Sequence, residues 1–357
     1  MIREAIIKLC NGEDLQGEET ATVFREIMEG AATPSQMAAF LTALRLKGET
    51  IEEITAAARI MREKMVKINV RTDIDIDREE INEDMETIID TCGTGGSGTN
   101  TFNISTASAF VVAGAGIKVA KHGNRSASSP CGSADVLENL GVDITMSPEQ
   151  SADCVKKIGI GFLYAPLFHP AMKNVGATRK EIGVRTIFNI LGPLASPAGV
   201  NAQVLGVYSA ALVEVMANVL NNLKIKRAFV VHGLDTLDEV TITGPTLVAE
   251  VKNAKVTVSE IRPEDFGMLS RHPKEIEGGS APENAKKVIA VLSGEKGARR
   301  DIVLLNSALA IVCAGKAETI KEGITLAEKS IDSGAAMEKL NQLKKIQKRE
   351  PRGIFYA

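Results

Sequence analysis

The pattern of apolar and polar positions changes once along the chain, at about residue 88. Before residue 67 the apolar residues follow helical spacing in four stretches, separated by polar or glycine-containing breaks. Thr33, Pro34 and Gln36 precede the third stretch, and Thr50 with Glu53 precedes the fourth, at N-cap and capping-box positions. The first 67 residues therefore predict four short helices.

From residue 88 short apolar runs alternate with helical stretches. The expected strands are TIID, IKVAKHG, GFLYAP, QVLGVYS, RAFVVHG and EVTITG, and the expected helices are STASAFVVAGAG, ADVLENLG, ADCVKKIG and AALVEVMANVLNNL. This alternation is typical of a mostly parallel sheet covered on both faces. The predicted fold class is α/β, a small helical domain plus a large α/β domain with a mostly parallel central sheet. Ligands are expected at the loops that follow the strands.

The amino-acid composition argues against some binding partners and favours one cellular location. The net charge of −3 argues against a nucleic-acid partner, and the most apolar window, residues 109–117, is too short to span a membrane. Five cysteines without C-x-x-C spacing predict neither a zinc site nor disulfides, so a reducing, cytoplasmic location is expected. The strongly acidic residues 72–90 predict an exposed connector.

One stretch carries a recognisable ligand-binding pattern. Gly93, Gly95 and Gly98 form G-x-G-x-x-G between an expected strand and an expected helix, where free backbone N–H groups favour an anion such as phosphate. A P-loop would need lysine after the last glycine, but Thr99 follows. A dinucleotide fold would need an acidic residue about 20 positions on.

Instead, the next expected strand ends in a cationic segment, residues 121–125, which suits a second phosphate. A basic residue there would also suit NADP, so a dehydrogenase remains an alternative at this point. Two phosphate-bearing parts of one ligand are the simpler interpretation.

Four segments in register resemble the anthranilate phosphoribosyltransferases. They are GTGGSGTNTFNIST, KHGNRSASSPCGSADVLENLGV, FHPAMKNVGATRKEIGVRTIFNILGPL and LDEVT, and the resemblance extends over nearly the whole chain. It implies transfer of the phosphoribosyl group of 5-phosphoribosyl 1-diphosphate (PRPP) to the amine of anthranilate, with magnesium, in tryptophan biosynthesis.

The resemblance also implies an organisation and an assembly. A helical domain of residues 1–70 would be completed by helices within 166–190, and residues 71–165 and 191–357 would form the large domain that binds PRPP. The fold would be that of the nucleoside phosphorylases and class II phosphoribosyltransferases, assembled as a homodimer.

The implied site residues fall into three groups. The PRPP site would consist of Gly93, Gly96, Ser97, Thr101, Asn103, Ile104, Ser105, Thr106, Lys121, His122, Gly123, Asn124, Arg125, Ser126, Ala127, Ser128, Ser129 and Ser133. The anthranilate site would consist of Gly93, Asn124, His169 and Arg179. The metal site, for two Mg²⁺ ions, would consist of Ser105, Asp238 and Glu239.

Two geometric expectations accompany this assignment. His169 and Arg179 would be roughly three turns apart on a straight helix, so Arg179 is expected to hold the carboxylate and His169 to form an outer access or binding position. Neighbouring residues of a strand point to opposite faces, so Asp238 and Glu239 can share a metal only in a loop or at a distorted start of EVTITG.

Three positions depart from the family pattern. Ser97 replaces a common Asp, and Pro130 and Cys131 replace a common Lys or Arg followed by Ser, so charges beside the expected PRPP position are lost. No residue is assigned as a general base. A pyrimidine nucleoside phosphorylase remains an alternative, although its usual KHS-type segment differs from KHGN, and a nucleic-acid-binding relative without activity would need a basic face.

Overall fold

The computed structural model describes residues 1–71, 86–126 and 130–346. The chain begins with the four predicted helices, α1 (Ile2–Cys10), α2 (Gly17–Met28), α3 (Pro34–Lys47) and α4 (Ile51–Lys64). The hydroxyl of Thr33 accepts the Gln36 N–H at 3.3 Å, and that of Thr50 accepts the Glu53 N–H at 3.2 Å. Both capping boxes are therefore confirmed, and they fix where α3 and α4 begin.

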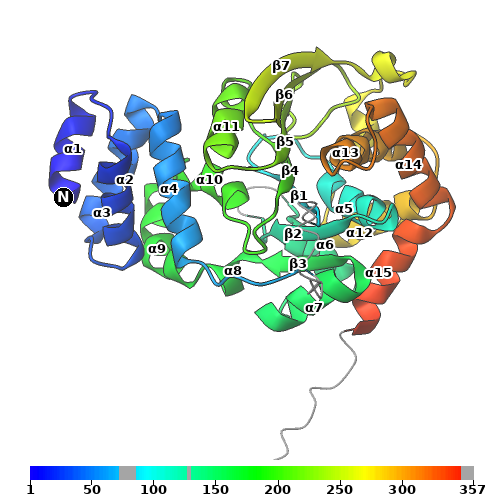
Figure 1. Cartoon of the computed structure of the whole chain (residues 1–357), viewed down its shortest axis with the longest axis horizontal. Coiled ribbons are helices and arrows are strands. Elements are labelled where there is room, and N and C mark those ends of the chain that lie inside the picture. The colour runs from blue at the N-terminus through cyan, green and yellow to red at the C-terminus, as the bar shows by residue number, and fades with distance from the viewer. Residues whose placement is uncertain (72–85, 127–129, 347–357) are drawn as a thin grey trace, which may run out of the picture.

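A seven-stranded sheet in the order β3-β2-β1-β4-β5-β6-β7 forms the centre of the molecule (Figure 1). β1 to β5 are parallel to one another, and β6 and β7 are antiparallel. The strands are β1 (Ile88–Gly93), β2 (Lys118–Gly123), β3 (Ile160–Tyr164), β4 (Ala202–Gly206), β5 (Arg227–Gly233), β6 (Thr246–Lys252) and β7 (Lys255–Ile261). The mostly parallel sheet is confirmed.

The expected strand EVTITG is wrong, because residues 239–244 form a loop between β5 and β6. The alternating pattern of this stretch has another cause. The hydroxyls of Thr241 and Thr243 both donate to the carboxylate of Asp235, and the Val240 N–H donates to Asn306 rather than to a strand.

Helices cover both faces of the sheet (Figure 1). One face contacts α5 and α13, and the other contacts α11, which packs on β5, β6 and β7. The remaining helical elements are α5 (Ile104–Gly114), α6 (Ser133–Asn139), α7 (Pro148–Ile158), α8 (Ala165–Phe168), η1 (Pro170–Met172), α9 (Lys173–Ile182), α10 (Phe188–Leu191), η2 (Gly192–Leu194), α11 (Ala211–Asn222), η3 (Pro263–Phe266), η4 (Pro273–Ile276), α12 (Ala281–Leu292), α13 (Ala298–Cys313), α14 (Ile320–Asp332) and α15 (Ala335–Ile346). No helix in the described ranges is long and apolar enough to cross a membrane.

The helical bundle does not have a core of its own. One apolar cluster joins residues of α1 to α4 with residues of α9, α10 and α11 and with the adjacent face of β4 and β5. In this cluster the ring of Phe24 on α2 lies 5.6 Å from that of Phe188 on α10. A larger cluster on the other face is built around α5 and α13.

The parallel strands bring their carboxyl ends to one edge of the sheet. Gly93 at the end of β1 pairs with Gly206 at the end of β4, and Gly206 pairs with Val231 near the end of β5. The chain runs from β1 to β2 and β3 on one side and then crosses to β4 on the other, so the strand order reverses at β1. A topological switch point of this kind is where open α/β sheets bind ligands.

β1 and β2 pair only at Ile88–Lys118 and Ile89–Val119. Farther along, the side chain of Asp90 bridges the two strands, because its Oδ1 accepts the His122 N–H at 3.2 Å. Asp90 is fully buried. Its assignment to an exposed acidic connector is therefore wrong, since it belongs to β1; residues 72–85 of that stretch lie outside the described residues.

Candidate active site

The glycine turn after β1 is attached to the end of β4. Gly95, Gly96 and Gly98 have φ of +64°, +76° and +77°, a left-handed conformation that favours glycine. The Thr94 N–H donates to the Gly206 carbonyl at 2.8 Å, and the Tyr208 N–H donates to the Thr94 hydroxyl at 3.2 Å. The turn therefore lies at the switch point.

The acidic pair Asp238–Glu239 meets this turn. The Gly95 N–H donates to Asp238 Oδ2 at 2.9 Å, and the Ser105 N–H at the start of α5 donates to Glu239 Oε1 at 3.2 Å. A Cβ on Gly93 would lie 2.6 Å from Asp238 Oδ2. Because the pair lies in a loop, strand alternation does not force the two carboxylates to opposite faces, which is the condition set for a shared metal.

Contacts of Asn306 and Asp235 give this loop its shape. Asn306 on α13 accepts the Val240 N–H at 2.9 Å and donates to the Val240 carbonyl at 2.8 Å. On the other side of the pair, the Asp235 carboxylate accepts the Thr241 hydroxyl at 2.6 Å. Residues on both sides of Asp238 and Glu239 are thus fixed before any ligand binds.

The electrostatics of the pair suit a divalent cation. Burial, followed by the charge of Asp238, raises the pKa of Glu239 to about 8. A cation between the carboxylates would offset both causes. The described residues hold no group of three or more His, Cys, Asp or Glu side chains that could bind a metal ion. One or two carboxylates completed by substrate phosphates is the arrangement that Mg²⁺ usually adopts, so the residues fit this ion.

Lys121 and His122 on β2 point to opposite faces of the sheet, as strand neighbours do. The buried Lys121 ammonium donates to the Thr91 carbonyl and to the Ser105 hydroxyl, the latter at 3.4 Å. It therefore places a positive charge beside the acidic pair and the start of α5.

His122, expected among the PRPP residues, lies against His169, with ring centroids 5.1 Å apart. Both rings are buried, and in each the Nε2 atom has no hydrogen-bond partner within the described part of the chain. Burial lowers the pKa of His122 to about 3 and that of His169 to about 4. Both imidazoles are neutral at physiological pH.

An outer position for His169 is wrong, because only 6% of the residue is exposed, while its assignment to the anthranilate site stays a prediction. The straight helix assumed for residues 169–179 is also absent. α8 ends at Phe168, residues 170–172 form η1, and α9 begins at Lys173. Pro170 cannot donate a main-chain hydrogen bond, which explains the interruption.

Arg179 on α9 is a half-buried guanidinium whose Cζ lies 5.4 Å from the ring centroid of Phe188. Burial lowers its pKa. No carboxylate of the described residues forms an ion pair with it. A desolvated arginine stacked on an aromatic ring is well placed for an aromatic carboxylate.

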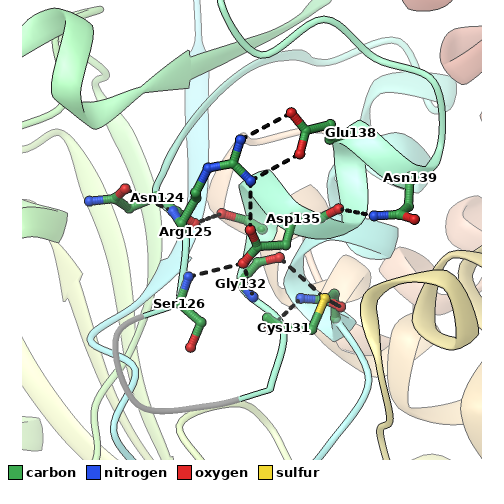
Figure 2. A network of polar contacts seen from close by, with 10 residues as sticks. Asn124, Arg125, Ser126, Cys131, Gly132, Asp135, Glu138 and Asn139 are labelled. Carbon is green, nitrogen blue, oxygen red and sulfur yellow. Dashed lines mark hydrogen bonds and ion pairs between the residues drawn. The ribbon is translucent and has the colours of Figure 1, made fainter.

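Arg125 points toward Asp135 and Glu138 on α6 (Figure 2). Its guanidinium pairs with Asp135 at 2.9 Å and with Glu138 at 2.9 Å. The Asp135 carboxylate also accepts the N–H groups of Ser126 at 3.1 Å and Gly132 at 2.9 Å. The cation that the end of β2 brings toward the site is therefore Lys121, since the charge of Arg125 is neutralised.

The other expected residues around this segment have defined places. Asn124 is exposed and its side chain accepts the Arg125 N–H at 2.7 Å, while the Ser133 hydroxyl donates to the Asn124 carbonyl at 3.3 Å. Phe162 and Ser133 crowd Gly123, leaving no room for a side chain. Ala127, Ser128 and Ser129 lie outside the described residues.

The start of α5 is fixed by residues from three segments. Asn103 donates to the Cys131 carbonyl at 3.2 Å and accepts from Asn284 on α12 at 3.1 Å. Thr101 forms a β-bridge with Glu277. The side chains of Ile104 and Thr106 are buried, so these two positions can offer a ligand little besides their main chain.

Two of the departures from the family pattern also occupy defined positions. The Ser97 hydroxyl lies 2.7 Å from that of Thr99, a contact confined to the glycine turn. The buried Cys131 thiol donates to the Asn103 side chain at 3.4 Å. Cys131 therefore supports the start of α5 despite the loss of a serine there.

Sequence reasoning missed four residues that shape the site: Arg185, Asn284, Asn306 and Asp235. Arg185 lies within a segment that carries the family resemblance, so the sequence contained a signal that could have identified it. Asp235 and its two threonine partners could have been recognised as an Asx-type loop. Asn284 and Asn306 act across the fold from α12 and α13, and no local pattern marks them.

Comparison with known proteins gives consistent matches. Residues 3–65 match the helical bundle domain of a glycosyl transferase family, and residues 85–337 match the α/β domain of that family. Anthranilate phosphoribosyltransferase from Geotalea uraniireducens is 55% identical, over 97% of this chain and 99% of that protein. The enzyme of the same name from Geobacter sulfurreducens is 56% identical, over 96% and 98%.

Solved structures agree with this match. Anthranilate phosphoribosyltransferase from Thermus thermophilus superposes with a TM-score of 0.87 at 40% identity, covering 96% of this chain and 98% of that one. The Saccharomyces cerevisiae enzyme, in complex with PRPP and Mg, superposes with a TM-score of 0.85 at 28% identity, covering 97% of each chain. The chain belongs to the anthranilate phosphoribosyltransferase family.

Proposed function

We propose that the chain transfers the phosphoribosyl group of PRPP to the amine of anthranilate, giving N-(5-phosphoribosyl)anthranilate and pyrophosphate, in tryptophan biosynthesis. The observation that carries this proposal is the meeting of the glycine turn, the start of α5 and the acidic pair at the switch point. Gly95 and Ser105 each donate a main-chain hydrogen bond to one member of the pair. A diphosphate with a hard cation matches this combination of N–H donors and carboxylates.

We assign the donor side of the site to the glycine turn, the segment 101–106 and the residues around Lys121. Asp238, Glu239 and Ser105 would hold magnesium, which when bound neutralises diphosphate charge and makes pyrophosphate a better leaving group. Lys121 contributes a buried cation beside Ser105. The main-chain N–H groups of the turn orient the diphosphate and stabilise charge as the bond to the anomeric carbon breaks.

We assign the acceptor side to Asn124, His169, Arg179 and Gly93. Arg179 would hold the anthranilate carboxylate by a bidentate contact while its guanidinium stays on Phe188. The anthranilate amine can attack as the neutral group and lose its proton after bond formation, so the reaction needs no base to activate it. His122, with a pKa of about 3, would be a poor proton acceptor at neutral pH, in keeping with this mechanism.

The direct test mixes the purified protein with PRPP, anthranilate and MgCl₂ and follows the loss of anthranilate fluorescence. We expect turnover that requires all three components and releases one pyrophosphate per anthranilate consumed. A protein that ignores anthranilate but cleaves a pyrimidine nucleoside with inorganic phosphate would contradict the proposal and favour the phosphorylase alternative.

Four finer proposals accompany this function. Residues 1–70, with helices of 166–190, form the acceptor-side domain, and residues 71–165 and 191–357 form the PRPP domain; the contacts of α9 with α2 and α3 support this division. Exposed Ile7 and Leu46 on the helical bundle support a homodimer.

The two carboxylates and the Ser105 hydroxyl support the binding of two Mg²⁺ ions per subunit. The five free cysteines support a cytoplasmic location.

A further inference from the structure

Arg185 joins the segment between α9 and α10 to the glycine turn. Its Nη2 donates to the Gly96 carbonyl, and its Cζ lies 4.5 Å from the ring centroid of Tyr208, just after β4. Within the described ranges no carboxylate forms an ion pair with it. Arg185 is exposed, so its position depends on these two contacts.

The glycine turn is held in place at its middle by this contact. Its first half is fixed to the sheet, because the N–H groups of Thr94 and Gly95 donate to Gly206 and Asp238. Its second half is fixed again at Asn100, whose carbonyl accepts the Gly278 N–H at 2.8 Å. Between these points, the hydrogen bond from Arg185 to Gly96 is the contact that comes from another element of the described structure.

The geometry of the peptide group gives this contact a consequence for the ligand. The C=O of Gly96 and the N–H of Ser97 belong to one planar trans peptide, so they point in opposite directions. Holding the carbonyl toward Arg185 therefore turns the Ser97 N–H the other way. A glycine peptide can flip readily, because glycine populates both signs of φ at similar cost.

We propose that Arg185 is a positioning residue for PRPP: it holds the Gly96 carbonyl, and so orients the next N–H group for the diphosphate, while Tyr208 holds Arg185. The proposal rests on the function proposed above. Arg185 would thus serve the binding of PRPP, the donor substrate. Arg179, six residues earlier in the chain, is assigned to anthranilate, the acceptor.

The test compares four variants by steady-state kinetics and by calorimetric titration with PRPP and Mg²⁺. Arg185→Ala is expected to raise the KM for PRPP about tenfold, the scale of one charge-assisted hydrogen bond, with kcat and the KM for anthranilate changed less than about twofold. Tyr208→Leu should shift the KM for PRPP in the same direction by a smaller factor. Added guanidinium should partly restore Arg185→Ala. Lys180→Gln, which removes an exposed cation from α9, is the matched control and should leave both KM values unchanged.

Arg185→Lys separates positioning from simple attraction of phosphate. Lysine keeps the charge but loses the planar stack on Tyr208, so a positioning role predicts that it stays impaired. Wild-type behaviour of both Arg185→Lys and Tyr208→Leu would overturn the proposal, as would an unchanged affinity of Arg185→Ala for PRPP. If the wild type binds PRPP but does not turn over anthranilate, the proposed function fails while calorimetry still decides the role of Arg185. A wild type that does not bind PRPP would end both.

Discussion

At the scale of single residues, the surroundings decide what each ionisable side chain can do. Lys121 and His122 are neighbours, yet one is a buried cation beside the acidic pair and the other is a neutral ring against His169. Burial raises the pKa of the Glu239 carboxyl and lowers the pKa of the His122 imidazole, in each case because water no longer stabilises the charged form.

The acidic pair provides the first prediction at this scale. Asp238→Asn combined with Glu239→Gln keeps the shape of the side chains but removes both carboxyl groups that could bind the cation. We expect loss of most activity, at least about a hundredfold in kcat/KM, together with the loss of magnesium dependence. Rates measured across a magnesium titration, beside the exposed control Glu264→Gln, test this. A double variant with wild-type magnesium dependence would exclude the pair as metal ligands.

Arg179 provides a second prediction. Arg179→Ala removes the guanidinium that lies on Phe188, so we expect the KM for anthranilate to rise about 10- to 100-fold, the range for a hydrogen-bonded charge. The KM for PRPP should change far less. Initial rates with each substrate varied in turn measure both constants, and Lys180→Ala on the same helix serves as the control. A larger rise for PRPP would contradict the assignment.

At the scale of elements, close approach between loops and strand ends shapes the site. Gly206 ends β4 beside the main chain of Asp238, and a Cβ at this position would overlap the Asp238 carbonyl oxygen. Glycine is needed there for space and not for its conformation. The acidic pair therefore reaches the glycine turn only because the end of β4 has no side chain.

We expect Gly206→Ala to displace the loop that carries Asp238 and Glu239. The backbone atoms of Asp238 cannot move aside as a flexible side chain can, so the loop must shift. We expect the Mg²⁺ concentration for half-maximal activity to rise about tenfold or more, and the free energy of unfolding to fall by a smaller factor. Magnesium titrations of activity and of heat of binding measure this effect. Gly244→Ala is the matched control, because it lies in the same loop with open space around it. Equal behaviour of the two variants would show that the close contact is unimportant.

The elements themselves could be predicted where their signals are local. Neighbouring residues predict the capping boxes at Thr33 and Thr50 and the glycine turn after β1. They do not predict the loop at 239–244, because its alternating Val, Thr and Ile residues resemble a strand. Its shape depends on Asn306, more than sixty residues away along the chain.

At the scale of the whole molecule, the buried histidine pair links the sheet to the helical segments around the site. His122 is the last residue but one of β2, and His169 lies between α8 and η1. Both pKa values are held well below 6.5 in the folded chain, at about 3 and about 4. Between about pH 6.5 and 4 the unfolded chain therefore binds more protons at these two positions.

The two histidines therefore make the folded protein less stable as the pH falls through this window. Asp90 and Glu239 act in the opposite sense, because their pKa values in the folded chain, about 6 and about 8, lie above the ordinary 3.8 and 4.5. Two histidines against two carboxyls leave little net change, so the contribution of one histidine is measured by difference. His169→Asn, which cannot take up the proton, is expected to gain stability relative to the wild type by about 1 kcal/mol per pH unit as the pH falls below 6.5. Urea midpoints of both proteins at pH 6.5 and 5.0 measure this gain. A difference between the two proteins that is the same at both pH values would contradict the pKa assigned to His169.

The sequence by itself determined the four N-terminal helices with the caps at Thr33 and Thr50, the five parallel strands, the glycine turn and the family, because each depends on residues that are close together in the chain or on segments that can be recognised one at a time. The tertiary structure alone decided which charges face the site. Asp135 and Glu138 neutralise Arg125, and Arg185 arrives at the glycine turn from a distant segment. The physical reason is that an ion pair or a hydrogen bond acts over a few ångströms in space, and the fold, not the spacing along the chain, sets which groups come that close.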